Sequence, residues 1–246
     1  MKSIVLGLVV ILLIGCKQQE KELTAQQVVD KAIEVSGGEK YTHAEVDFTF
    51  RNIKYKSLRQ NGRYSLQRLL PDSLNTLDII TNEGFTRLQK SDKVVLADTT
   101  AAKYAESVNS VHYFVQLPFG LNDESVQKKL LDEVSIKEKE YYKIEVTFSE
   151  EGGGVDFEDV FLYWISKEEF TVDYLAYKFF TDGGGIRFRE SYNPRVIEGI
   201  RFVDYINYRT KTADADFYNV GKLYEAGELI KLSLIEKEDI RVRLLN

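Results

Sequence analysis

The sequence predicts an α+β protein that is mainly antiparallel β, built as a curled sheet or an open half-barrel with two or three covering helices. Three observations predict this class. Polar and apolar residues alternate over many short segments, tight-turn signals separate these segments, and few segments have a helical period. Strands that follow one another through short turns pair antiparallel, and a long antiparallel sheet curls most easily into such a shape.

The first expected element is an amphipathic helix. Thr24 precedes Gln27 by three residues, which is the spacing of a capping box. Apolar residues then recur at helical intervals up to the glycine pair Gly37-Gly38, where a helix readily ends. This helix is expected to cover one face of the sheet.

Strands begin at Ala44, where the apolar period changes to two. Asn61-Gly62 separates the segments 53–60 and 63–70, and this dipeptide is the strongest short hairpin signal. A further strand is expected over 74–81, with a tight turn at 82–84.

A second helix interrupts the strands. It is expected to be capped by Asp98-Thr99 and to end before Pro118, because seven residues between these points share one helical face: Ala101, Tyr104, Ala105, Val108, Val111, His112 and Val115. A short helical turn is expected over 123–128. Strands then resume, and the expected segments are 131–137, 142–148, 157–165, 172–180, 186–192, 200–209 and two in the tail, from 230 and from 240.

The N-terminus has the pattern of a lipoprotein signal peptide. Lys2 is followed by the apolar run 4–14, which is shorter than the roughly 20 residues that a membrane-spanning helix needs. Leu13-Ile14-Gly15-Cys16 then matches a lipobox. We therefore expect a signal peptide over 1–15, lipid on Cys16 with a tether over 16–23, and a single globular domain over 24–246. The alternative is a buried apolar helix with an ordinary core cysteine.

Composition narrows the function classes. The formal net charge is −6 with no basic stripe, which argues against a nucleic-acid partner. Cys16 is the only cysteine, so the chain forms no disulfide of its own and keeps no thiol for catalysis. The two histidines, His43 and His112, sit in no catalytic motif, and we expect each to be a boundary residue with one hydrogen-bond partner. No catalytic residue, metal or cofactor is predicted.

Two groups of residues are candidate ligand sites. The acidic residues around the glycine loop at 152–154 could bind Ca²⁺, although their spacing is not that of an EF-hand and a solvated hairpin tip explains them more simply: Glu150, Glu151, Asp156, Glu158 and Asp159. A second group could line a cavity in the curled sheet: Tyr163, Trp164, Tyr177, Phe179, Arg187 and Arg189. Here an arginine would receive a carboxylate or phosphate. The simpler interpretation is ion pairing of Arg187, Arg189 and Arg201 with Glu190, Asp173 and Asp204 across strands.

Most of the chain resembles a flavobacterial-type lipoprotein family of unknown function. The stretches that carry the resemblance are Ser36-Gly37-Gly38, 111–121, 151–154 with 157–161, 172–177 and 199–205. The order of elements is also similar, more distantly, to the Lol-type lipoprotein carriers, which implies a half-barrel with an apolar cavity. The closer family implies no catalytic residues. An aldolase label borne by some members does not fit, because the sequence lacks alternating strand and helix units.

Three functions remain open at this point. The chain could bind a lipid-like or other apolar ligand, it could be a non-catalytic subunit of an outer-membrane or periplasmic complex with an envelope protein as partner, or, least favoured, it could be a hydrolase. In each case lipid on Cys16 would hold it to a membrane. Lys17 is not an inner-membrane retention aspartate, which favours the outer membrane.

Overall fold

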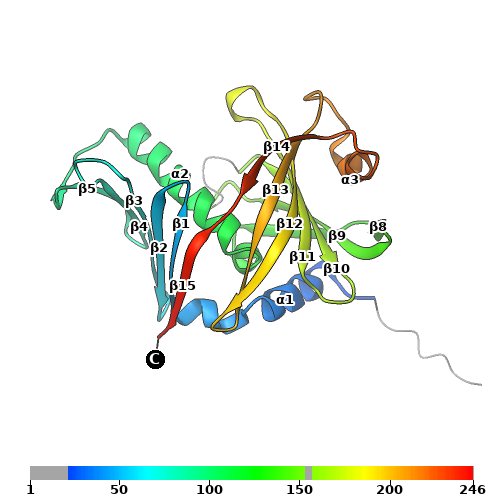
Figure 1. The fold of residues 1–246 in the computed structure, drawn as a ribbon, viewed down its shortest axis with the longest axis horizontal. Coiled ribbons are helices and arrows are strands. Elements are labelled where there is room, and N and C mark those ends of the chain that lie inside the picture. Colours follow the sequence, from blue (N-terminus) through cyan, green and yellow to red (C-terminus); the bar gives the residue numbers. More distant parts are fainter. Residues whose placement is uncertain (1–21, 153–156, 246) are drawn as a thin grey trace, which may run out of the picture.

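The computed structural model describes residues 22–152 and 157–245. The expected signal peptide, the lipidation site Cys16 and the acidic residue Asp156 lie outside the described residues. Fifteen strands are described, all paired antiparallel, and they form two sheets (Figure 1). The expectation of a mainly antiparallel β fold is therefore confirmed.

The first sheet has seven strands. Their order across the sheet is β15 (Glu238–Leu244), β1 (Ala44–Phe50), β2 (Ile53–Gln60), β3 (Arg63–Leu69), β4 (Leu77–Thr81), β5 (Gly84–Gln89) and β6 (Asp92–Lys93). The hairpin at Asn61-Gly62 is confirmed: both residues have positive φ, as a tight hairpin turn requires, and Gln60 pairs with Arg63.

The second sheet has eight strands. Their order is β14 (Ile230–Ile235), β13 (Ile200–Arg209), β12 (Gly185–Ile197), β11 (Val172–Phe179), β10 (Val160–Ser166), β9 (Lys139–Phe148) and β7 (Val126–Leu130), and β8 (Val134–Ile136) also pairs with β9. The described strands of each sheet leave it open at both ends. β14 and β15 are consecutive in the chain but belong to different sheets, so the chain crosses from one sheet to the other at Glu236 and Lys237.

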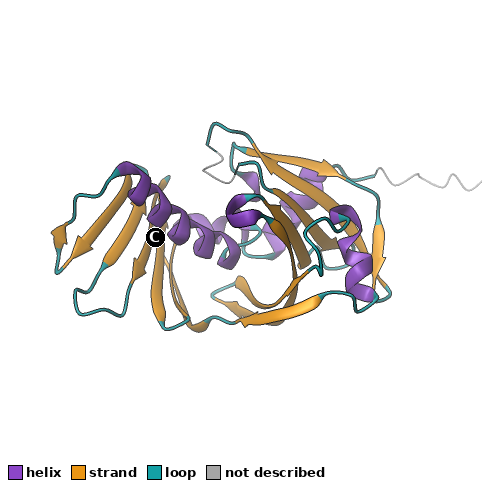
Figure 2. Cartoon of the chain, turned by 90° about the horizontal axis from the view of Figure 1, so that it is seen from above, coloured by secondary structure: helices purple, strands orange, loops and turns teal. Residues whose placement is uncertain are grey.

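Within the described residues, three α-helices and four 3₁₀ turns accompany the sheets. The helices are α1 (Ala25–Val35), α2 (Asp98–Val115) and α3 (Val220–Glu225), and the turns are Gly38–His43, Phe119–Asn122, Thr181–Gly183 and Phe217–Asn219. α1 starts with the expected capping box between Thr24 and Gln27. α2 runs across the first sheet toward the second (Figure 2).

Each helix buries its apolar face against a particular sheet face. Residues of α1 and the end of α2 pack on one face of the second sheet, and α3 packs on the opposite face. α2 also packs on the first sheet, where Val111 and Val115 meet Val46, Phe48 and Tyr55. α2 therefore contributes to the packing of both sheets.

Two sequence predictions about helices are wrong, and one helix was missed. No helical turn forms over 123–128, because β7 starts at Val126 and pairs with β9, with Val126 opposite Phe148. The cap of α2 is Ala97, without a side-chain hydrogen bond, and Asp98 lies in the first turn, where a carboxylate favours the helix dipole. α3 was not expected from the sequence, since six residues are too few to show a period.

Candidate functional site

The candidate site is a cavity of about 500 Å³ between α2 and the second sheet. Its lining comes from the C-terminal half of α2, from strands β9 to β14, from the end of β1, and from the crossover at Lys237. Aromatic rings supply most of the apolar wall: Phe50, Tyr113, Phe114, Phe148, Phe161, Tyr177, Phe179 and Tyr205. A cavity of this size and lining falls within the range of small-molecule sites, about 300–1,000 Å³.

Phe161 lies at the centre of the aromatic wall. Its ring centroid is 5.9 Å from that of Tyr113, 5.7 Å from Phe148 and 5.4 Å from Tyr177. Phe114 of α2 is 5.5 Å from Tyr177. Edge-to-face and stacked rings at these distances hold one another in place, so the wall is formed before any ligand arrives.

A hydroxyl pair joins α2 to the sheet behind this wall. The hydroxyls of Tyr113 and Tyr163 are 2.6 Å apart, and Tyr163 is fully buried. Burial raises the pKa of both phenols above the usual value, so both keep their protons. The pair satisfies two polar groups that would otherwise be buried alone.

Arg189 of β12 is the most enclosed arginine of the lining. Its side chain is 8% exposed, and its guanidinium carbon lies 3.7 Å from the ring centroid of Phe114. Nη2 donates a hydrogen bond of 3.1 Å to the Tyr177 hydroxyl. Nε has no partner within the described parts of the chain. Tyr177 and Phe114 therefore hold Arg189 in a set orientation while part of its hydrogen-bonding capacity stays unused.

Lys237 occupies the crossover between the two sheets and also lines the cavity. Its backbone N–H donates to Asp204 Oδ1 at 3.0 Å, and its Nζ donates to the Val203 carbonyl. Burial lowers the pKa of Lys237 to about 8, and the nearby Asp204 carboxylate counteracts part of that effect. Asp204 is in turn held by two hydrogen bonds from Arg195, of 2.8 and 2.9 Å, and one of 2.7 Å from Asn193.

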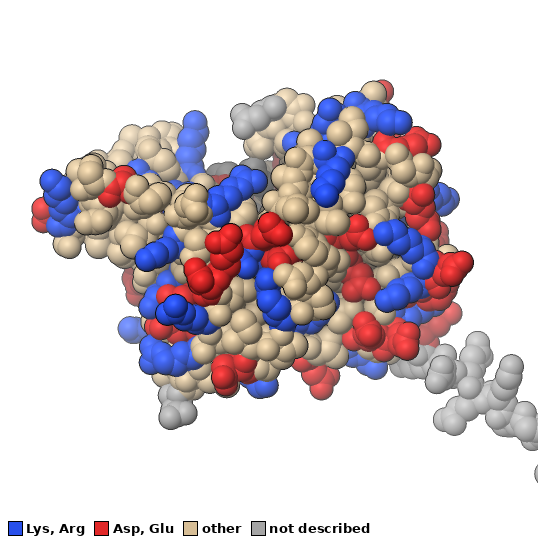
Figure 3. Space-filling view, in the orientation of Figure 1, with Lys and Arg blue, Asp and Glu red and all other residues tan. Residues whose placement is uncertain are grey.

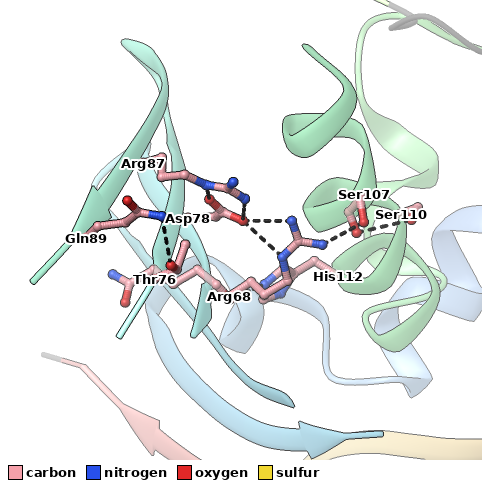
Figure 4. Close-up of polar contacts among 9 residues, drawn as sticks. Arg68, Thr76, Asp78, Arg87, Gln89, Ser107, Ser110 and His112 are labelled. Atoms are coloured by element: carbon pink, nitrogen blue, oxygen red, sulfur yellow. Dashed lines mark hydrogen bonds and ion pairs between the residues drawn. The ribbon is translucent and has the colours of Figure 1, made fainter. Parts of the chain in front are cut away.

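A buried ionic cluster fastens α2 to the first sheet, outside the cavity (Figure 4). Asp78 is fully buried between two arginines: Arg68 Nη2 is 2.7 Å from Oδ2 and Arg87 Nε is 2.6 Å from Oδ1. Arg68 also donates to Ser107 of α2 at 2.6 Å, and Arg87 lies over the ring of Tyr104 at 3.6 Å. These contacts hold the polar side of α2, which leaves its other side to the cavity.

His112 makes a second polar contact from α2 to the first sheet. Its Nε2 donates to the Gln67 carbonyl at 3.1 Å, and its Nδ1 is buried without a partner among the described residues. Burial lowers the pKa of His112 to about 4, so the ring is neutral near pH 7. One hydrogen-bond partner was expected, but the residue lies in the core and not at a boundary.

The cavity brings together four of the six predicted ligand-binding residues, namely Tyr177, Phe179, Arg187 and Arg189. Tyr163 lies behind the wall and Trp164 lies on the opposite face of β10, against Phe188 and Gly221. Neighbouring residues of a strand point to opposite faces, so the two could not share one cavity. Whether the four lining residues bind a ligand stays a prediction.

The predicted cross-strand ion pairs are wrong. Arg187, Arg189 and Arg201 form none with Glu190, Asp173 or Asp204 in the described segments. Glu190 pairs with Lys137 at 2.8 Å, Asp173 accepts hydrogen bonds from Tyr141 and Thr171, and Asp204 pairs with Arg195 and Lys237. The strand register and the crossover between the sheets decide which cation lies next to each carboxylate. The alternation of polar and apolar residues in the sequence does not give this information.

The candidate calcium site has no support from the part of its cluster that is described. Asp159 is buried and lines the cavity instead of joining a carboxylate group. In residues 22–152 and 157–245, no group of three or more His, Cys, Asp or Glu side chains could hold a metal ion.

Over the same residues, no helix is both long and apolar enough to cross a bilayer. Charged residues of both signs are interspersed over the face seen in Figure 3.

Sequence reasoning missed Lys237 and the Arg68–Asp78–Arg87 cluster. The turn between β4 and β5 places Thr81 opposite Gly84, and counting back from it places Asp78 opposite Arg87. That pair could have been found from the sequence. Lys237 stands alone where the alternation of the tail breaks, which is a weaker signal.

Comparisons with known proteins give a family and a fold. Residues 2–237 match the model of a family of unknown function (DUF6503). No curated protein matches the sequence. A LolA superfamily protein from Nitrosomonas europaea is similar in structure, with a TM-score of 0.52, 15% identity, and coverage of 92% of this chain and 96% of that one. A DUF1329 family protein from Desulfovibrio piger has a TM-score of 0.50 at 12% identity, covering 89% and 92%. The expected Lol-like architecture is therefore confirmed.

Proposed function

This chain belongs to the family of unknown function DUF6503, which brings no assigned activity, and we propose from its cavity that the protein binds a lipid-like ligand in the cell envelope. The observation that best supports this proposal is the preformed aromatic cavity of about 500 Å³ between α2 and the second sheet. Burying an acyl chain there would gain about 0.8 kcal/mol for each CH₂ group removed from water. Its Lol-like fold is consistent with such a role.

The proposed location rests on the N-terminal sequence. The lipobox that ends at Cys16 would place diacylglycerol on that residue and hold the body on a membrane surface through a short tether. From there the cavity could take a ligand from the same membrane or pass one to it. This location is part of the proposal.

Native mass spectrometry tests the proposal directly. The protein for the test is the mature chain, residues 16–246 with Cys16→Ser, purified from bacterial cells without detergent. We expect added mass that is released into organic solvent, and one-to-one uptake of a fluorescent fatty acid. A bare mass together with no uptake would refute ligand binding.

A matched pair of variants locates the ligand. Phe114→Ala removes a ring of the cavity wall, whereas Phe85→Ala removes a ring of β5 outside the cavity. We expect fatty-acid uptake to weaken in the first variant and to persist in the second. Equal effects of the two changes would place the ligand elsewhere.

One observation favours an interaction subunit as the second candidate. Val196, Leu232 and Leu234 are exposed apolar side chains on β12 and β14, and β14 is the end strand of its sheet. End strands that expose apolar side chains can take part in protein contacts. If no ligand is found, crosslinking of the lipidated protein in its membrane should capture a partner at this edge.

A further inference from the structure

We propose that Arg189 and Lys237 form a receptor for the anionic head group of the cavity's ligand, a carboxylate or phosphate at one end of an apolar chain. This inference rests on the proposed function, because it names the class of ligand for the same cavity. Its evidence is separate, since it depends on the cations of the wall and on the side chains that orient them, and not on the volume of the cavity.

The first step is the unsatisfied hydrogen bonding of Arg189. The side chain is 8% exposed, it lines the cavity, and its Nε has no partner within the described residues. A buried N–H without an acceptor is unfavourable, because it has lost its hydrogen bond to water without gaining another. A ligand oxygen that accepts a hydrogen bond from Nε would satisfy this group. Guanidinium also matches carboxylate and phosphate geometry, because its planar donors can make two parallel hydrogen bonds.

The second step is the fixed orientation of this guanidinium. The Tyr177 hydroxyl accepts from Nη2 at 3.1 Å, and the Phe114 ring lies 3.7 Å away. Neither neighbour carries a negative charge that would neutralise Arg189. The cation is therefore held ready at the wall without a counter-ion from these neighbours, which reduces the ordering cost of binding an anion.

The third step is a second buried cation within electrostatic reach. Lys237 is 4% exposed and lines the same cavity, and the charge of Arg189 contributes to lowering the pKa of Lys237. Asp204 is 3.5 Å from Lys237 Nζ, but its oxygens already accept hydrogen bonds from Arg195, Asn193 and the Lys237 N–H. Among the described residues, Asp204 is thus the one carboxylate shared by Lys237 and Arg195, and Arg189 adds a further positive charge that acts on Lys237. An anion would relieve the repulsion among these cations.

The cavity lining carries more cations than carboxylates. Its described cations are Arg51, Arg187, Arg189 and Lys237, against the carboxylates Glu106 and Asp159. Both of these carboxylates interact with other groups. The protein as a whole is acidic, with a formal charge of −6, so a cationic lining is a local feature of this cavity.

The test compares ligands that share one chain and differ in head group. Palmitate, hexadecyl phosphate, hexadecanol and methyl palmitate are each titrated against a fluorescent fatty acid bound to the mature chain with Cys16→Ser. We expect the two anions to bind at least about tenfold more tightly than the alcohol and the ester, as a charged hydrogen bond provides. Acetate and inorganic phosphate, which have no chain, are expected not to displace the probe.

Variants of this same Cys16→Ser chain show which residue causes the effect. Arg189→Gln should remove the preference for anions while the alcohol binds as before, and Arg189→Lys should restore part of it. Arg241→Gln removes the same charge from the exposed face of β15 and should leave the preference intact. The ligand series on the unchanged protein does not depend on how well any variant folds.

The outcomes separate the two proposals. If the acid and the alcohol bind equally well, or if Arg189→Gln weakens both alike, the head-group receptor is refuted and ligand binding stands. If no chain-bearing compound binds, both proposals fail. If inorganic phosphate alone displaces the probe as well as hexadecyl phosphate does, the site recognises a free anion and the assignment to a lipid head group is refuted.

Discussion

The hydroxyl of Tyr113 on α2 meets the hydroxyl of Tyr163 on β10 at 2.6 Å, with Tyr163 fully buried. This contact joins the helix to the second sheet directly behind the aromatic wall. On its other side, the same helix is joined to the first sheet through Arg68 and Ser107 (Figure 4). The wall of the cavity that α2 forms is therefore attached to both sheets.

Tyr163→Phe should destabilise the protein by about 1–3 kcal/mol, because it leaves the buried Tyr113 hydroxyl without its partner. Urea unfolding measures the change. Tyr142→Phe is the control, since that ring stacks on Phe170 at 6.0 Å and no hydrogen bond of its hydroxyl is described. The double variant Tyr113→Phe with Tyr163→Phe should cost less than the sum of the single changes. Strict additivity would show that the hydroxyls do not interact.

Asp78→Asn should lower the free energy of unfolding by about 3–5 kcal/mol, more than any other substitution proposed here, because it leaves two buried arginines without their carboxylate. The comparison is Asp47→Asn, whose ion pair with Lys56 is exposed, with 41% and 38% of the two side chains accessible. An exposed pair contributes at most about 1 kcal/mol. Thermal and urea unfolding should separate the two variants clearly. Similar stabilities would mean that the cluster does not hold α2.

Stability should rise with pH between about 4 and 6.5 because of His112. Its folded pKa is about 4 against an ordinary value of 6.5, so in this window the unfolded chain binds more protons than the folded one. The loss below pH 4 would be on the order of 3 kcal/mol, since each pKa unit corresponds to about 1.4 kcal/mol. His112→Gln should flatten the difference in urea unfolding between the two ends of this window. Carboxylates titrate in both proteins, so a slope that is equal in both would contradict this assignment.

Filling the cavity should block binding without unfolding the protein. Ser110 is a small residue on the cavity side of α2, and Ser110→Trp would occupy space in the lining. We expect at least about a tenfold loss of fatty-acid affinity with a stability change below about 1 kcal/mol. Ala102→Trp places the same ring on an exposed position of the same helix and should bind normally. Unchanged fatty-acid affinity in Ser110→Trp would show that the ligand does not bind in this cavity.

Anion binding should weaken as the pH rises through about 8. Lys237 has a pKa of about 8 in the unliganded protein and loses its positive charge above it. The other charged groups that act on Lys237 are Asp204, Arg195 and Arg189, and the lowered pKa of Asp204 keeps that carboxylate ionised near pH 8. Palmitate affinity should therefore fall between pH 7 and 9 while hexadecanol affinity stays constant. A parallel change in both ligands would exclude Lys237 as the cause.

Much of the secondary structure was predictable because it depends on local patterns. The capping box at Thr24 located the start of α1, and Asn61-Gly62 determined the register of β2 with β3. β13 begins and ends where its alternation does, at Ile200 and Arg209. The segment 123–128 was mispredicted because its pairing with β9, some twenty residues along the chain, overrides its local preference.

The candidate site was predictable only in part, for a geometric reason. Strand alternation separates Tyr163 from Trp164 but does not say which face a helix will cover. The structure puts α2 on the side of Tyr163 and α3 on the side of Trp164. Tyr177, Phe179, Arg187 and Arg189 line the cavity because β11 and β12 present them on the α2 side.

The sequence by itself determined most of the order of helices and strands, the antiparallel class and the lipobox, because each depends on residues close together in the chain. The tertiary structure alone decided the division into two sheets, the crossover that buries Lys237, and the placement of α2 between the sheets. Those features depend on contacts between residues far apart in the chain. A cavity with buried cations at its wall could be recognised only after these contacts had formed.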